Sequence, residues 1–185
     1  ELAVYADETS NAAFVASDLL SQAEHGADSQ VVLVASSLSI VEAVQLEIEK
    51  QLVVLPRYDI AKQAFQNSFA VVMSNTADAF ELLNEYAPEH LIIASDNAES
   101  LAENIINAGS VFLGHYAPES AGDYASGTNH TLPTNGFAKA YSGVSLDSFF
   151  KKITFQQINI AGIKNIGKAI EIMASAEGLE AHKNA

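Results

Sequence analysis

Residues 31–52 read VVLVASSLSIVEAVQLEIEKQL, and this stretch contains the unit from which the fold can be predicted. Its first five residues, Val31–Ala35, are all apolar, which is typical of a strand buried on both faces of a sheet. From Leu38 to Leu52, apolar and polar residues follow the spacing of an amphipathic helix. The end of this helix stays open, because residues 52–55 also fit a strand, and Pro56 ends either element.

The same alternation of strand and helix continues on both sides of this unit. Further apolar runs of strand length lie at residues 2–6, 69–73, 90–94 and 110–113, and helical patterns lie at 11–25, 58–67, 77–86 and 98–107. This order predicts an α/β domain over residues 1–144, built on an incomplete doubly wound (Rossmann-like), mostly parallel sheet. Because the first run starts at residue 2 without a lead-in, we expect further sequence upstream.

Residues 114–143 have a different composition. They hold five of the ten glycines and two of the four prolines, and long irregular segments inside compact domains are often functional. After Val144 the pattern turns helical through Ile163, Ile166, Ile170 and Met173, and Gly178 is placed to cap that helix. We therefore expect residues 145–185 to form a small helical appendage.

The charge balance and the lack of cysteine exclude several functions. The 23 acidic and 9 basic residues give a formal net charge of −14, which repels nucleic-acid phosphates and anionic membrane surfaces. No apolar run is long enough to span a bilayer. The absence of cysteine excludes disulfides, thiolate metal sites and a thiol nucleophile. We expect a cytoplasmic protein without nucleic-acid or membrane partners.

Two pairs of polar residues stand near the ends of predicted helices. Gln22 and His25 are three residues apart in the first helix, so their side chains share a face and could chelate one ion. The ordinary alternative, which spacing alone favours, is that His25 stabilises the negative helix end. Glu177 and His182 lie near the end of the chain, where the ordinary alternative is an exposed, frayed terminus.

Two further pairs suit acid–base chemistry or metal binding. Glu89 and His90 stand at the start of a predicted strand, and both side chains can titrate near neutral pH when their surroundings shift them. The ordinary alternative is a surface carboxylate beside a half-buried histidine. Asp123 and His130 lie in the glycine-rich segment, where flexible turns can aim metal ligands. Asp123 could instead be a turn residue bonded to its own backbone, and nothing around His115 indicates more than a surface role.

Several motifs together resemble one enzyme family. They are GDYASGTNH with LPT, and APEHL, LLSQAEHG, YSGVSLDSF, ITFQ and EGLEAH. In this order they are similar to histidinol dehydrogenases, and the resemblance runs along residues 1–185. The chain covers less than half of that family's length, beginning where the family's chain returns from its second domain to its first.

The resemblance implies a zinc ion in the active site. By matching motifs, its protein ligands are Gln22, His25, Asp123 and His182. Glutamine is an unusual zinc ligand, so its assignment depends on the resemblance. Two nitrogens of L-histidinol would complete the coordination, so that the metal orients the substrate.

The resemblance also implies the catalytic roles. His90 takes the alcohol proton as the first hydride leaves to NAD, and Glu89 activates the water that adds to the aldehyde. A hydrated aldehyde needs no thiol intermediate, which agrees with the absence of cysteine. His130 and Glu177 match substrate-contacting positions, as do the ligands Gln22, His25, Asp123 and His182 and the base His90. No GxGxxG follows a strand, so the NAD contacts are expected in the missing half.

The family is a homodimer, and the resemblance implies that Glu177 and His182 act in the partner's site. The isolated 185 residues are therefore expected to be inactive. Two alternatives remain at this point: a non-catalytic metal-binding or dimerisation module with the same fold, or a related dehydrogenase for another amino alcohol.

Overall fold

The computed structural model describes residues 1–185, and five strands form one sheet in which every neighbouring pair is parallel. The sheet order is β3-β2-β1-β4-β5. The strands are β1 (Leu2–Ala6), β2 (Val31–Ala35), β3 (Phe69–Val72), β4 (His90–Ala94) and β5 (Ser110–Leu113). The order is that of a doubly wound fold lacking its sixth strand, so the predicted α/β class is confirmed.

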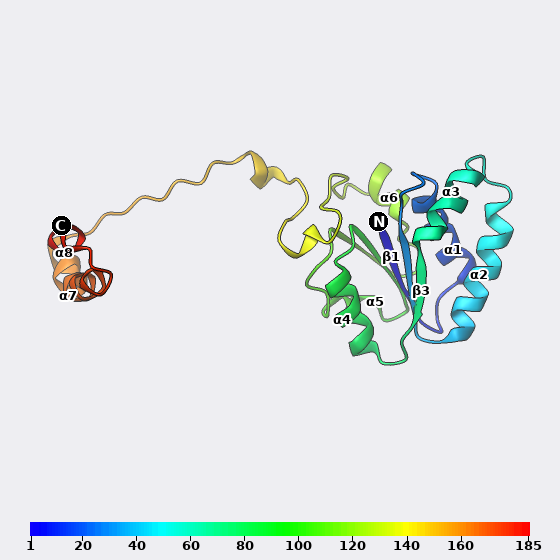
Figure 1. Cartoon of the computed structure of the whole chain (residues 1–185), viewed down its shortest axis with the longest axis horizontal. Helices are drawn as coiled ribbons and strands as arrows, with labels where there is room; N and C mark the ends of the chain where they lie inside the picture. Colours follow the sequence, from blue (N-terminus) through cyan, green and yellow to red (C-terminus); the bar gives the residue numbers. More distant parts are fainter. The chain divides into compact units, whose positions relative to one another are not determined.

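Helices cover both faces of this sheet (Figure 1). On one face lie α1 (Ala12–Ala23), α2 (Leu38–Leu52) and α3 (Tyr58–Ala64), and on the other lie α4 (Thr76–Tyr86) and α5 (Ala98–Ala102). Alternate residues of each strand face opposite layers: Val4 and Ile92 pack in the layer of α1, and Tyr5 and Ile93 in the layer of α4. Because both faces are covered, β1, β2 and β4 are buried along their whole length.

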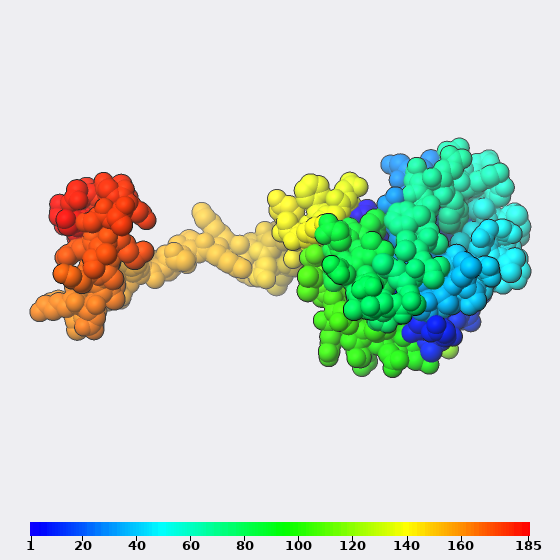
Figure 2. Space-filling model, turned by 60° about the horizontal axis from the view of Figure 1, so that its bottom comes forward, coloured from blue at the N-terminus to red at the C-terminus, as the bar shows by residue number.

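The first unit of the chain comprises residues 1–148, which form the closely packed body coloured blue to yellow in Figure 2. The second unit is Phe149–Ala185, with α7 (Ile160–Ala176) and α8 (Glu180–Asn184). The boundary between the two units follows Ser148, four residues after the predicted boundary at Val144. In α7 only Ala174 is buried, so its isoleucines have almost no core of their own.

Local details differ from the sequence-based expectations. Residues 114–143 are not all loop, because α6 (Glu119–Tyr124) and a 3-10 turn at Phe137–Lys139 lie within them. Residues 145–185 are not helical from their start: a 3-10 turn (Leu146–Phe149) precedes irregular chain, and the long helix begins only at Ile160, capped by the Asn159 side chain. The other 3-10 turn, Phe65–Asn67, extends α3 to the predicted end. No helix is long and apolar enough to cross a membrane.

Candidate active site at the amino edge of the sheet

The turn before β4 fixes the position of Glu89 and His90. Helix α4 ends in a left-handed residue, Ala87 (φ 52°), whose amide donates to Leu83. The amides of Gly109 and Ser110 then donate to the carbonyls of Pro88 and Glu89, each at 2.9 Å. Two hydrogen bonds from the start of β5 therefore hold this peptide segment at the amino edge of the sheet.

His90 points into the layer that contains α1. It is the first residue of β4 and has the same orientation as Ile92, and its ring lies 5.9 Å from that of Phe112. Its side chain is 5% exposed. Burial lowers the pKa of His90 below its usual value, more than the carboxylates of Glu89 and Asp123 raise it. The imidazole is therefore neutral at pH 7 and able to accept a proton.

Glu119, in the first turn of α6, is an ionisable partner of His90. Its Oε1 lies 3.4 Å from His90 Nδ1, and its side chain is 2% exposed. Burial, and then the nearby Asp123 carboxylate, raise the pKa of Glu119 to about 8. Neither Nδ1 of His90 nor Oε2 of Glu119 has a hydrogen-bond partner.

Glu119 was not predicted to be a site residue, although its position in the sequence pointed to Asp123. Glu119 and Asp123 are four residues apart, the spacing that places two side chains on one helical face. This spacing has that meaning only if residues 119–124 are helical, and Gly122 among them indicated a loop instead. Gly122 is buried, and a Cβ there would stand 2.6 Å from the Phe112 ring. Glycine at this position lets α6 approach β5.

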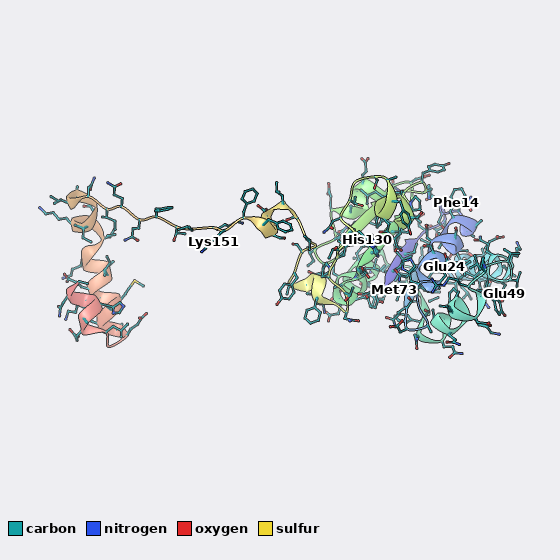
Figure 3. All side chains as sticks on the ribbon, turned by 90° about the horizontal axis from the view of Figure 1, so that it is seen from above. Phe14, Glu24, Glu49, Met73, His130 and Lys151 are labelled. Carbon is teal, nitrogen blue, oxygen red and sulfur yellow. The ribbon has the colours of Figure 1, made fainter.

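Asp123 and His130 form a pair at the mouth of this site, on the segment where Figure 3 labels His130. Nδ1 of His130 lies 2.8 Å from Oδ1 of Asp123. The Asp123 side chain is 8% exposed and the His130 side chain is 71% exposed. Hydrogen bonding to Asp123 and the charge of that carboxylate raise the pKa of His130. Asp123 is thus not a simple turn residue bonded to its own backbone.

Gln22 and His25 lie at the same edge and on the same face of the sheet. Gln22 is buried in the last turn of α1. His25 does not stand in that turn as expected: the helix ends at Ala23, Glu24 is its cap, and His25 is exposed. One turn before Gln22, Asp18 lies near enough to Glu119 for its carboxylate to add to the raised pKa of Glu119.

The remaining predicted site residues, Glu177 and His182, belong to the second unit. Glu177 caps the end of α7 and His182 lies in α8, and both are exposed there. Gly178 adopts a left-handed conformation (φ 72°) between the two helices, as expected of a helix cap. His115, expected to be a plain surface residue, is partly buried and lies 3.0 Å from Asp96.

The donors at the amino edge fit a divalent metal ion. His90, Glu119 and Asp123 each offer a ligand atom, and these atoms lie within 4.8 Å of one another. Nitrogen and carboxylate oxygen are ligands that zinc accepts. The chain does not have a comparable set of residues for binding a dinucleotide. The β1–α1 connection, DETSN, has no glycine, and its Asp7 carboxylate is already bonded to Thr9 and Ser95.

The fold and the site together define a doubly wound α/β domain that carries buried acid–base groups, able to hold a metal ion, at the amino edge of its sheet. The profile of one protein family, described as Histidinol dehydrogenase, matches residues 1–185. The chain belongs to the histidinol dehydrogenase family, a family of oxidoreductases.

Individual relatives agree with this assignment. The chain is 60% identical to a histidinol dehydrogenase of Bacteroides fragilis (strain YCH46), over 100% of this chain and 43% of the relative. It is 52% identical to that of Haemophilus influenzae (strain 86-028NP), again over 43% of the relative. A crystal structure of histidinol dehydrogenase from Elizabethkingia anophelis superimposes with a TM-score of 0.92 at 57% identity, covering 99% of this chain and 42% of that one. The chain therefore spans less than half the length of these relatives.

Proposed function

We propose that this chain is the metal-binding and proton-transferring part of a histidinol dehydrogenase. The complete enzyme would oxidise L-histidinol through L-histidinal to L-histidine with NAD, in the cytoplasm, as a step of histidine biosynthesis. The observation that carries the proposal is the buried, neutral His90 next to Glu89 at the amino edge. A family profile whose match extends over residues 1–185 supports it.

His90 acts as the general base of the first oxidation. Its imidazole accepts the hydroxyl proton of the alcohol while the carbinol hydride leaves to NAD. Burial keeps the imidazole unprotonated at neutral pH, so a free lone pair is present when substrate arrives. Glu119, 3.4 Å from Nδ1, limits how the ring can turn.

Glu89 acts in the second oxidation. Its side chain is 19% exposed, so water reaches the carboxylate, and the amide of Ser110 holds the backbone carbonyl of Glu89. Glu89 removes a proton from the water that adds to the aldehyde carbon, and the hydrate then loses the second hydride. No covalent enzyme intermediate is required, in keeping with a chain without cysteine.

Gln22, His25, Asp123 and His182 would hold the zinc ion, and His130 and Glu177 would contact the substrate. When bound, zinc supplies a fixed charge that orients the imidazole and amine nitrogens of histidinol. The exposed Glu177 and His182 belong to the second unit, whose long helix has almost no core. Their place would be the active site of the other chain in a homodimer.

A chimera tests the proposal. This chain replaces the matching segment of the Bacteroides fragilis enzyme, and NADH formation from L-histidinol is followed. We expect a zinc-containing chimera that forms two NADH per histidinol, and a His90→Gln chimera at least about 100-fold slower. Equal rates for the two chimeras would refute the role of His90. A folded, zinc-loaded but inactive chimera would instead favour a non-catalytic metal-binding module, and activity only with other amino alcohols would favour a related dehydrogenase.

A further inference from the structure

We propose that the pair of His115 and Asp96, at the carboxyl edge of the sheet where the strands end, fixes the position of α6, so that His115 is a positioning residue for the site at the opposite edge. Nε2 of His115 lies 3.0 Å from Oδ1 of Asp96. That α6 is held in this way does not depend on the proposed function. The effect on catalysis does rest on it, because α6 carries Glu119 and Asp123.

A short connector, residues 114–118, joins the end of β5 to the start of α6. Strand β5 ends at Leu113 on the carboxyl edge, but α6 begins with Glu119, which lies beside His90 at the amino edge. The connector must therefore run back along the sheet. Five residues reach at most about 18 Å when fully extended, and β5 itself is about 10–13 Å long, so the connector has little slack. The place where it is attached at its start limits where α6 can lie.

Three residues attach the connector to neighbouring elements. Gly114 has a left-handed conformation (φ 86°), and its amide donates to the carbonyl of Ile93 in β4 (3.0 Å). The Tyr116 ring packs against that of Phe14 in α1, with 6.1 Å between the ring centroids. His115 makes the side-chain hydrogen bond of the connector. Of the three attachments, only that of His115 joins two polar side chains.

Asp96 is itself held by a hydrogen-bond network at the carboxyl edge. Its amide donates to Oγ1 of Thr9 (3.0 Å), which donates to Oδ1 of Asp7 (2.6 Å). The hydroxyl of Ser95 donates to the other oxygen of Asp7 (2.5 Å). The network lies at the ends of β1 and β4, where the strand order reverses and doubly wound folds commonly bind ligands. In this chain the protein's own side chains bond to one another there, and they give His115 a fixed partner.

Helix α6 depends on its attachments because it is short. It has six residues and no side-chain cap at its start, and isolated helices of that length are not stable in water. The close approach of Gly122 to Phe112 sets how near α6 lies to β5. The connector sets where along the sheet the helix begins, and with it the place of Glu119.

The two side chains of the pair differ in exposure. The His115 side chain is 18% exposed, whereas that of Asp96 is 71% exposed. Nδ1 of His115 is buried and has no hydrogen-bond partner. The tautomer with its proton on Nε2 donates to Asp96 and leaves only an acceptor atom unpaired. Because ion pairs with an exposed member add little to overall stability, we expect the pair to act locally, on the connector and α6.

The test is amide hydrogen exchange of the 185-residue chain, followed by NMR. The reporters are the amides of Ala125 and Ser126 at the end of α6, which donate to the carbonyl of Ala121. In Asp96→Ala, which alters an exposed side chain and so spares the fold, we expect them to exchange about tenfold faster or more. His115→Ala should have the same effect. The double variant should exchange no faster than either single one, because both changes remove the same bond.

The conservative variant His115→Gln keeps a side-chain N–H donor, so its α6 amides should exchange like those of the unaltered chain. The matched control is Glu99→Ala, which removes another exposed carboxylate that borders the same pocket as Asp96. The amide of Ala87, at the end of α4, should exchange at the same rate in every variant. In an active chimera, Asp96→Ala should lower kcat about threefold or more because α6 is displaced, and Glu99→Ala should not.

Three results would overturn the proposal. The first is unchanged exchange at Ala125 and Ser126 in Asp96→Ala, and the second is additive effects in the double variant. The third is faster exchange of these amides in Asp96→Ala without any change in kcat, which would remove the positioning role. An unaltered chimera without activity would refute the proposed function instead, and the exchange rates would still decide whether the pair holds α6.

Discussion

Three ionisable side chains at the amino edge, those of His90, Glu119 and Asp123, are each less than a tenth exposed to solvent. Burial disfavours the charged form of each group, so it lowers the pKa of the histidine and raises that of Glu119. A base that is neutral and a carboxyl that can be protonated at pH 7 are thereby placed together. Perturbed groups of this kind concentrate at functional sites.

Asp18, one turn before Gln22 in α1, gives a prediction about stability. Burial raises its pKa to about 7, so the folded state binds this proton more tightly than the unfolded state. The stability that this bound proton contributes is fully present below about pH 4 and is lost as the pH rises through about 7. Asp18→Asn should therefore raise the free energy of unfolding at pH 8 by about 2 kcal/mol, after allowance for partial solvent screening.

Urea unfolding of both proteins at pH 5 and pH 8 measures this effect. The difference between Asp18→Asn and the unaltered chain should grow with pH. The control, Asp59→Asn on the exposed side of α3, should change little between the two pH values. A constant difference for Asp18→Asn would show that its carboxyl is well solvated.

At the scale of elements, the apolar runs predict all five strands, four of them to the residue, because a strand covered on both faces must be apolar throughout. The helices are predicted less well at their ends. The pattern at 98–107 extends beyond α5, which ends at Ala102. Helix α6 was not predicted because Gly122 is typical of a loop. In the structure, a glycine is required there because α6 packs closely against Phe112. The site residue Glu119 was missed with it.

The contact between β5 and the Glu89 turn gives a prediction at this scale. A Cβ at Gly109 would stand 2.5 Å from the carbonyl oxygen of Glu89, a backbone atom that cannot move without displacing Glu89 and His90. We expect Gly109→Ala to lower the free energy of unfolding by about 1–3 kcal/mol. In the chimera it should slow catalysis as well.

The matched control is Gly167→Ala in α7, where no atom lies within 4 Å of the added Cβ. It should leave the unfolding of the first unit unchanged, because it removes only a flexible helical residue. Urea denaturation followed by circular dichroism measures both variants. If Gly109→Ala unfolds at the same urea concentration as the unaltered chain, the close approach is not a constraint on the turn.

At the scale of the whole molecule, the proposed site residues are distributed over the two units of the chain. The first holds Glu89, His90 and Asp123, and the second holds Glu177 and His182. Sequence patterns cannot show which chain's second unit completes a site, because they describe one chain only. The family resemblance supplied that expectation, and the nearly coreless α7 agrees with it.

Mixing two inactive mutants of the complete chimera tests whether sites are shared. If His182 acts in the partner's site, a mixed dimer of His182→Asn and His90→Asn has one site with both lesions and one with neither. Activity after subunit exchange should then approach about a quarter of that of the unaltered enzyme, since half of the dimers are mixed and each has one intact site. No recovery, with exchange verified by native mass spectrometry, would mean that each chain builds its own site.

The most direct test of the central claim is to assay the two oxidations separately in the chimera with Glu89→Gln. If this chain supplies the proton-transferring groups of a histidinol dehydrogenase, oxidation of L-histidinal should fall by about 100-fold or more, since only that step consumes water. Oxidation of L-histidinol to the aldehyde should fall by less than about tenfold, because His90 remains. Equal losses in both half-reactions, or none in either, would contradict the account.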